Sequence, residues 1–352
     1  MLKYSVEKKI FVFKNPSGTS RGVLTEKPAW FIHLWDDNNP KIVGIGECSV
    51  IPNLSVDFQD EHSYEKNLHY LINSIIERIS LNNQYSDLTD FIPSLKEFPS
   101  ILFGIETAFI DLKNGGKKLF FDTAFTRGKK SIPINGLIWM GDEYFIQKQI
   151  EEKLEQGYSC IKMKIGALDF KKEYQILKQL RDRFSSKELI LRVDANGAFE
   201  FNDTQRVLDL LAELDLHSIE QPIKAGNWKQ MAFLCSNTNL PIALDEELIG
   251  VHAKERKVDL LDEISPQYII LKPSLHGGII GTQEWIRLAE ERKISWWITS
   301  ALESNIGLNA IAQFTSMYEN PLHQGLGTGN LYVENFPTKL RIRKGEIFIS
   351  KK

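Results

Sequence analysis

The second half of the chain repeats one pattern, a short apolar stretch that ends in a single charged residue and is followed by an amphipathic helical segment. These charged residues occupy positions 164, 194, 220, 245 and 272, so that 25 to 30 residues separate each from the next. A strand, a helix and two loops fit this length. The alternation therefore predicts an α/β domain built on a parallel sheet.

The number of repeats indicates how this sheet closes. With a first strand at 132–136 and a last strand near 323–325, we expect about eight βα positions, the number that closes a TIM-type barrel. A doubly wound open sheet is the alternative, but it gathers its site at one switch point rather than at the ends of successive strands. We therefore predict a barrel over residues 126–330.

The first part of the chain has a different pattern. Three stretches rich in aromatic and β-branched residues, separated by turn residues, predict an antiparallel sheet at 4–16, 23–36 and 41–47. Two helical periods follow, at 68–79 and 101–112, so residues 1–125 are expected to form an α+β domain. The tail, 331–352, resembles a hairpin around Lys344-Gly345 that returns to this domain and could extend its sheet.

Composition excludes several functional classes. The net charge of −3 gives no basic field for nucleic acid, and no apolar run approaches the roughly 20 residues of a membrane span. The charged N-terminus lacks a signal-peptide core, so we expect a cytoplasmic protein, with a homo-oligomer possible. Cys48, Cys160 and Cys235 are far apart and form no CxxC pair, which favours buried thiols over a disulfide framework or zinc.

Two lysines share one face of the strand Ser159–Gly166. Side chains alternate along a strand, so Lys162 and Lys164 point one way while the apolar residues between and beside them point the other. Taken alone, this pattern is typical of an edge strand with lysines in water. In a barrel the same two lysines would instead point into the mouth, where the carboxyl ends of the strands meet.

The other strand ends would bring further charges to that mouth. The expected set is Lys162, Lys164, Asp194, Glu220, Asp245 and Lys272. Three neighbouring carboxylates repel one another unless a cation intervenes, and all-oxygen ligation favours Mg²⁺, for which Mn²⁺ could substitute. A lysine beside a divalent cation and another ammonium has a lowered pKa and can act as a base. The pattern predicts proton abstraction next to a carboxylate, with the metal stabilising the anion.

Each of these residues also has a simpler interpretation. Asp194 could cap the following helix, Glu220 could lie in a turn, and Asp245 could belong to a solvated acidic patch. Lys272 before Pro273 could extend its ammonium to solvent. One shared site explains the regular spacing better than four unrelated roles.

The motifs at these strand ends resemble those of the enolase superfamily, muconate-lactonizing subgroup. They are Lys162-Met163-Lys164, Val193-Asp194-Ala195-Asn196, Ile219-Glu220-Gln221-Pro222, Ala243-Leu244-Asp245-Glu246 and Leu271-Lys272-Pro273, with Gly44-Ile45-Gly46-Glu47-Cys48 in the first domain. The resemblance implies an α+β capping domain over a (β/α)7β barrel, with capping loops near Gly18–Arg21 and Cys48–Leu54 closing the mouth. It also implies a lysine base and Mg²⁺, as is general for enolase-type sites.

On this resemblance, Lys164 is the expected base and Asp194, Glu220 and Asp245 the metal ligands. Lys162 would hold the substrate carboxylate and lower the pKa of Lys164, and Lys272 would offer its ammonium on the other face. The remaining expected roles are support of the metal ligands by Asn196 and Glu246, and binding of a second substrate carboxylate by Ser300, Gly277 and Gly278. Gly277-Gly278 could instead be a helix-opening turn, and His276 and His323 are expected to be structural.

Three further segments are similar to the o-succinylbenzoate synthases of menaquinone biosynthesis: Ser300–Gly307, Gly46–Ser49 with Pro52, and Gly325–Gly329. Dipeptide epimerases share the Leu-Glu-Ser motif but place an acidic D-x-D motif on the final strand, where this chain has no acids. The resemblance implies a small carboxylate substrate and Mg²⁺-dependent syn-dehydration of a succinyl-cyclohexadiene carboxylate. A dipeptide epimerase, an N-acylamino acid racemase using both lysines, and a non-catalytic carboxylate-binding barrel remain alternatives.

Overall fold

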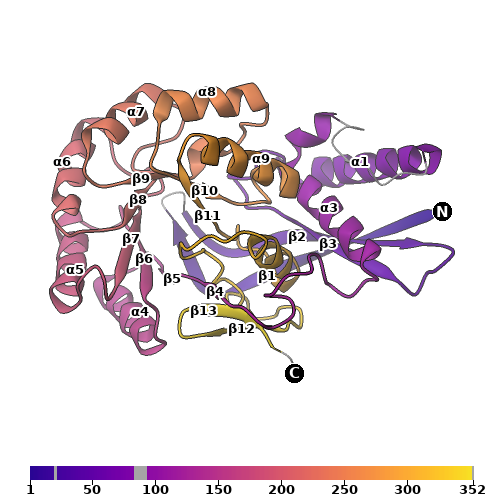
Figure 1. Cartoon of the computed structure of the whole chain (residues 1–352), viewed down its shortest axis with the longest axis horizontal. Helices are drawn as coiled ribbons and strands as arrows, with labels where there is room; N and C mark the ends of the chain where they lie inside the picture. The colour runs from indigo at the N-terminus through magenta and orange to yellow at the C-terminus, as the bar shows by residue number, and fades with distance from the viewer. Residues whose placement is uncertain (20–21, 83–92, 351–352) are drawn as a thin grey trace.

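The computed structural model describes residues 1–19, 22–82 and 93–350 and shows a capping domain packed on a barrel (Figure 1). The cap consists of β1 (Leu2–Thr19), β2 (Gly22–Asp36), β3 (Val43–Ser49), α1 (Glu61–Asn82), the 3₁₀ helix η1 (Pro93–Glu97) and α3 (Pro99–Lys113). Its three strands form an antiparallel sheet in the order β1-β2-β3. The predicted sheet and the two predicted helices are thus confirmed.

Two glycines explain how closely α3 packs on β3. A Cβ at Gly46 would lie 1.8 Å from the carbonyl oxygen of Gly104, and a Cβ at Gly44 would lie 2.2 Å from that of Ala108. Both positions therefore require glycine for the helix to lie directly on the strand. This contact fixes β3, in which Glu47 follows Gly46 and accepts hydrogen bonds from the backbone amides of Ser304 and Gly307.

The barrel strands run parallel in chain order. They are β5 (Gly136–Ile138), β6 (Cys160–Lys164), β7 (Ile190–Asp194), β8 (Ser218–Glu220), β9 (Ile242–Leu244), β10 (Tyr268–Leu271) and β11 (Ser295–Ile298). The helices between and after them are α4 (Glu143–Glu155), α5 (Phe170–Arg183), α6 (Phe201–Ala212), α7 (Trp228–Asn237), the 3₁₀ helix η2 (Glu246–Leu248), α8 (Lys254–Ile264), α9 (Gly278–Glu291) and α10 (Asn305–Thr315). Because the order has no reversal, the doubly wound alternative is excluded.

A short last segment closes the ring. Gly325 bridges Thr299 just beyond β11, and Gln324 bridges Ile134 just before β5, both in parallel. The eighth barrel position is therefore occupied by isolated bridges rather than by a full strand. The enolase-like arrangement of cap and barrel is confirmed.

Two strand predictions need correction. The first barrel strand is β5, which begins at Gly136, because Ile132–Pro133 (β4) belongs to another sheet. The C-terminal hairpin, β12 (Leu340–Arg343) and β13 (Glu346–Ile349), pairs with β4 and does not extend the capping sheet. The tail meets the cap earlier, where Tyr332 bridges Phe13 of β1.

The barrel has two apolar regions. Outward-facing side chains of the strands pack beneath the helices in one large core, and inward-facing Ala243, Ile270 and Trp297 fill the barrel below the mouth. Arg192 also lies inside, with its guanidinium 4.0 Å from the centroid of the Trp297 ring. The three cysteines are buried free thiols, and no described helix is long and apolar enough to cross a membrane.

Candidate active site

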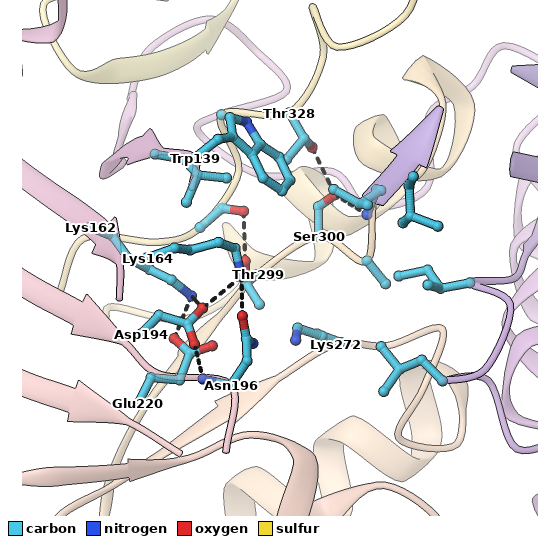
Figure 2. A pocket seen from close by; sticks show the side chains of 18 of the residues that line it. Trp139, Lys162, Lys164, Asp194, Asn196, Glu220, Lys272, Thr299, Ser300 and Thr328 are labelled. Atoms are coloured by element: carbon cyan, nitrogen blue, oxygen red, sulfur yellow. Dashed lines mark hydrogen bonds and ion pairs between the residues drawn. The ribbon is translucent and has the colours of Figure 1, made fainter. Parts of the chain in front are cut away.

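Strand register brings the charged residues together at the mouth of the barrel. Lys164 pairs with Asp194 across β6 and β7, and Asp194 pairs with Glu220 across β7 and β8. Asp245 and Lys272 directly follow β9 and β10. All six predicted charges therefore lie at the same end of the barrel, as Figure 2 shows for five of them.

A cavity of about 220 Å³ lies over these residues. Its lining residues include Lys162, Lys164, Asp194, Asn196, Glu220 and Lys272 from the barrel, and Gly22–Leu24 and Ile51–Leu54 from the cap. The cap thus covers the mouth with part of the predicted segment Cys48–Leu54. The other predicted loop, Gly18–Arg21, includes residues 20 and 21, which lie outside the described residues.

The lysines and carboxylates form a buried ionic network. Lys162 Nζ lies 2.9 Å from Asp194 Oδ2 and also contacts Glu220, while Lys164 Nζ lies 3.1 Å from Asp194 Oδ2. Lys272 Nζ contacts Asp245. The side chains of these three lysines are only 8–12% exposed, so the charges interact with little screening by solvent.

Burial and neighbouring charges shift the pKa values of the acids in different directions. Burial would raise the pKa of Asp194, but the ammonium groups of Lys162 and Lys164 outweigh it and lower that pKa. Burial and repulsion by Asp194 raise the pKa of Glu220 well above its ordinary value. Glu220 is therefore the carboxylate that a further cation would stabilise most.

The pKa values of Lys272 and Lys162 are shifted as well. Burial works to lower the pKa of Lys272, but the carboxylates of Asp245, Glu246 and Glu220 raise it. The pKa of Lys162 is raised for the same reason, by Asp194 and Glu220 against burial. Both groups are therefore held as ammonium ions at neutral pH.

The residues at the mouth fit a divalent cation chemically. In the described part of the chain no three acids already converge on one point as a metal cage, and ammonium groups lie between them instead. Nevertheless, Glu220 Oε1 and Asp245 Oδ1 are buried carboxylate oxygens without a hydrogen-bond partner. Carboxylate oxygens are the ligands that Mg²⁺ prefers, and a bound cation would favour the ionised form of Glu220.

Asn196 joins the lysine to a second acid. Lys164 Nζ donates to Asn196 Oδ1 at 2.6 Å, and Asn196 Nδ2 donates to Glu246 Oε1 at 3.0 Å. Asn196 and Glu246, the two residues expected to support the metal ligands, are thus hydrogen-bonded to each other beside Lys164. Their predicted effect on the metal ligands stays a prediction.

Of the three residues predicted to bind a second substrate carboxylate, only Ser300 lines the cavity. Ser300 lines it, and its hydroxyl lies 2.7 Å from that of Thr328. Gly277 and Gly278 do not line it, and the amides of Ile279 and Ile280 that follow them donate to the carboxylate of Glu106 from α3. This correction has a simple cause, because the start of α9 already binds an anion supplied by the chain itself.

The histidines lie outside the cavity. His276 Nδ1 accepts a hydrogen bond from the backbone amide of Lys272 at 2.9 Å, and burial lowers its pKa to about 3. His323 Nε2 lies 3.1 Å from the hydroxyl of Ser159. Both contacts agree with the structural roles expected for them.

Several cavity residues are not apparent from the sequence pattern. Trp139 forms one wall, with its ring centroid 5.8 Å from Lys164 Nζ, and Asn135, Thr299 and Thr328 add polar groups. Trp139 directly follows β5, so it is a strand-end residue like the lysines. The misplaced first strand concealed this relationship.

Comparisons with known proteins agree with this fold. The family described as "Enolase C-terminal domain-like" matches residues 146–352. The chain therefore belongs to the enolase superfamily.

Full-length similarity narrows the family further. The chain is 47% identical to an o-succinylbenzoate synthase from Desulfotalea psychrophila, with 99% of both chains covered. The crystal structure of MenC from that organism superposes with a TM-score of 0.85 at 43% identity, again over 99% of both chains. An L-amino acid-D/L-Glu epimerase from Francisella philomiragia is 30% identical over 70% of each chain. Within the superfamily, the chain thus falls in the o-succinylbenzoate synthase family.

Proposed function

We propose that this chain converts 2-succinyl-6-hydroxy-2,4-cyclohexadiene-1-carboxylate to o-succinylbenzoate and water, a step of menaquinone biosynthesis. The main support is the 47% identity to an o-succinylbenzoate synthase over both full lengths. The site has the necessary groups, because lysines from β6 and from the end of β10 lie on either side of three carboxylates. It follows that the substrate is a small carboxylate held beneath the cap.

Lys164 is the proposed base. Its Nζ takes the proton α to the ring carboxylate, which breaks a C–H bond and leaves the electron pair delocalised onto that carboxylate. In a syn-dehydration the hydroxyl leaves from the same face. The Lys164 ammonium is then the group placed to return the proton to that hydroxyl, so water departs and the ring becomes aromatic.

Lys162 and Lys272 are proposed to remain ammonium ions during this reaction. Carboxylates raise the pKa of both groups, so each can stabilise negative charge without exchanging a proton. Lys162 would hold the substrate carboxylate beside the base. Lys272 would face the opposite side of the ring, because β10 is separated from β6 by three strands.

Asp194, Glu220 and Asp245 are proposed to hold Mg²⁺, with Mn²⁺ as a possible substitute. The ion supplies positive charge that stabilises the anion formed from the substrate carboxylate. Binding it requires the carboxylates to exchange part of their pairing with Lys162 and Lys272 for the metal. The unpaired oxygens of Glu220 and Asp245 are available for this exchange.

The rest of the cavity suits the succinyl-bearing ring. Trp139 offers an aromatic face next to Lys164, and the hydroxyls of Ser300 and Thr328 offer donors for the succinyl carboxylate. These contacts are proposals for binding rather than for chemistry. On this proposal, the ring would lie near β5 and β6 and the succinyl chain near the loop that follows β11.

Epimerisation is the second candidate, since an L-amino acid-D/L-Glu epimerase is 30% identical over 70% of each chain. Such a reaction would require Lys164 and Lys272 to exchange protons on opposite faces of one carbon. The last barrel segment, Gly325–Gly329, has no acid to bind a substrate ammonium. This difference favours a substrate without an amine.

The direct test is to incubate the purified protein with the cyclohexadiene substrate and Mg²⁺ and to follow the absorbance of the aromatic product. Dehydration is expected at a rate that saturates with substrate. Parallel incubation with N-acyl amino acids and dipeptides in D₂O, read by NMR, tests the second candidate. Rapid deuterium exchange of both enantiomers without dehydration would reject the proposed function.

A further inference from the structure

A lysine of the capping domain reaches into the loop that carries Ser300. The Lys27 side chain, on β2, is completely buried, and its Nζ donates to the carbonyl oxygen of Leu302 at 3.0 Å and contacts the hydroxyl of Ser49. The hydroxyl of Tyr332 donates to the same carbonyl. Two donors from outside the barrel therefore meet on one backbone oxygen of the segment between β11 and α10.

Leu302 has an unfavourable backbone conformation that these donors hold in place. Its φ is 61°, in the left-handed region where a residue with a side chain is disfavoured by steric contact with its own backbone. Such a conformation persists only when surrounding groups determine it. Lys27 and Tyr332 are the donors that do so on the carbonyl side.

The amide of the same residue contacts a hydroxyl that lines the substrate cavity. Leu302 N donates to Ser300 Oγ at 3.0 Å, and Ser300 Oγ lies 2.7 Å from Thr328 Oγ1. Ser300, Leu302 and Thr328 all line the cavity, and Figure 2 shows the contact between Ser300 and Thr328. One left-handed residue thus connects a buried ammonium of the cap to the hydroxyl pair proposed to bind the succinyl carboxylate.

The charges around Lys27 indicate that this connection is costly to maintain. Burial lowers the pKa of Lys27, while Glu47 and Glu303 counteract that effect. Glu47 in turn accepts hydrogen bonds from Ser304 N and Gly307 N, both at 2.8 Å, and so holds the start of α10. Lys27 thus also balances the buried carboxylates of Glu47 and Glu303, which its removal would leave without a cation, so its effect on the Leu302 segment has to be measured separately from its effect on stability.

We propose that Lys27 is a positioning residue, which fixes the backbone at Leu302 and thereby orients Ser300 toward the succinyl carboxylate. The inference rests on the proposed function and deepens it. It makes the cap part of substrate recognition through a buried contact, in addition to the residues with which it covers the mouth. Lys27 itself touches no substrate.

The test compares Lys27→Met with Lys257→Met. Lys257 is an equally buried lysine, but it contacts Glu284 at 2.8 Å and the carbonyl of Gly281, neither of which lines the substrate cavity. Each variant is assayed for kcat and KM and for binding of two ligands by calorimetry. The ligands are o-succinylbenzoate and benzoate, which shares the ring carboxylate but lacks the succinyl chain.

For Lys27→Met we expect affinity for o-succinylbenzoate to fall about tenfold, the effect of losing one oriented hydrogen bond to a charged group. Benzoate affinity should stay unchanged, and KM should rise more than kcat falls. Lys257→Met should bind both ligands like the original protein. Tyr332→Phe removes the other donor to Leu302 O and should show the same selective loss to a smaller extent, which tests the inference even if Lys27→Met does not fold.

Two results would overturn the inference. One is unchanged affinity for o-succinylbenzoate in folded Lys27→Met or, if that protein does not fold, in Tyr332→Phe. The other is an equal loss of affinity for both ligands, which indicates general disorder of the site. Failure of the original protein to dehydrate the cyclohexadiene substrate would instead reject the proposed function, so the two failures are distinguishable.

Discussion

Lys164 donates a hydrogen bond to Asn196 Oδ1 at 2.6 Å, and this contact fixes the proposed base at the wall of the cavity. Asn196 has a positive φ of 45° and lies two residues after Asp194, so the same turn places both partners of the lysine. The backbone amide of Asn196 also donates to Asp194 Oδ1 at 3.0 Å. The position of the base therefore depends on a turn that Asp194 itself stabilises.

Replacing Lys164 by alanine should abolish the base without removing the carboxylates. We expect turnover of the cyclohexadiene substrate to fall by about 10²–10⁴-fold, the usual contribution of a general base. Binding of Mn²⁺, measured by electron paramagnetic resonance, should persist. Undiminished turnover in this variant would contradict the proposed mechanism.

Lys272 is expected to act by charge rather than by proton exchange. Lys272→Arg keeps a positive charge near Asp245 and should retain more activity than Lys272→Met. In D₂O, neither the original protein nor Lys272→Arg should exchange the α-proton of an N-acyl amino acid at a rate comparable to dehydration. Fast exchange through both lysines, read by NMR, would favour the epimerase alternative.

The carboxylates should couple Mg²⁺ binding to stability. A ligand that binds only the folded state raises the melting temperature by mass action. We expect Mg²⁺ to raise the melting temperature of the original protein, and to raise it much less in Glu220→Gln and Asp245→Asn. Equal shifts in all three proteins, measured by calorimetry, would place the metal elsewhere.

Asp57 should make the cap less stable as pH rises. Burial raises the pKa of Asp57 from 3.8 to about 6, against hydrogen bonds from Ser100 that favour the charged form. The folded state therefore binds an extra proton between these values, and stability is highest below the unfolded pKa and is lost as pH rises through about 6. Relative to Asp57→Asn, the unfolding free energy should fall by about 2 kcal/mol between pH 4 and pH 7. A constant difference across this range, measured by denaturant unfolding, would contradict this account.

The sequence was sufficient to predict the barrel and the charges at its mouth. Residues at strand ends follow from a regular strand–helix spacing, so Asp194, Glu220 and Asp245 could be brought together without coordinates. Which lysine contacts which of these carboxylates was harder to predict. Whether Lys162 contacts Asp194, Glu220 or both depends on strand register, which spacing alone does not determine.

Other features depend on contacts between distant segments. Gly277-Gly278 begins a helix whose amides could bind an anion, and the sequence gives no sign that Glu106, about 170 residues earlier, occupies that position. The C-terminal hairpin pairs with Ile132–Pro133, whose apolar character resembled a barrel strand. In the sequence, Lys27 cannot be distinguished from a surface lysine of a β-strand, whereas in the structure its side chain is buried.

The most direct test of the central claim is the dependence of dehydration on a divalent cation. Protein treated with EDTA and then freed of chelator should not dehydrate the cyclohexadiene substrate, and added Mg²⁺ should restore product absorbance until one ion per chain is bound. Full dehydration in the presence of EDTA would contradict the account, because the carboxylates at the mouth would then act without the metal they are proposed to hold.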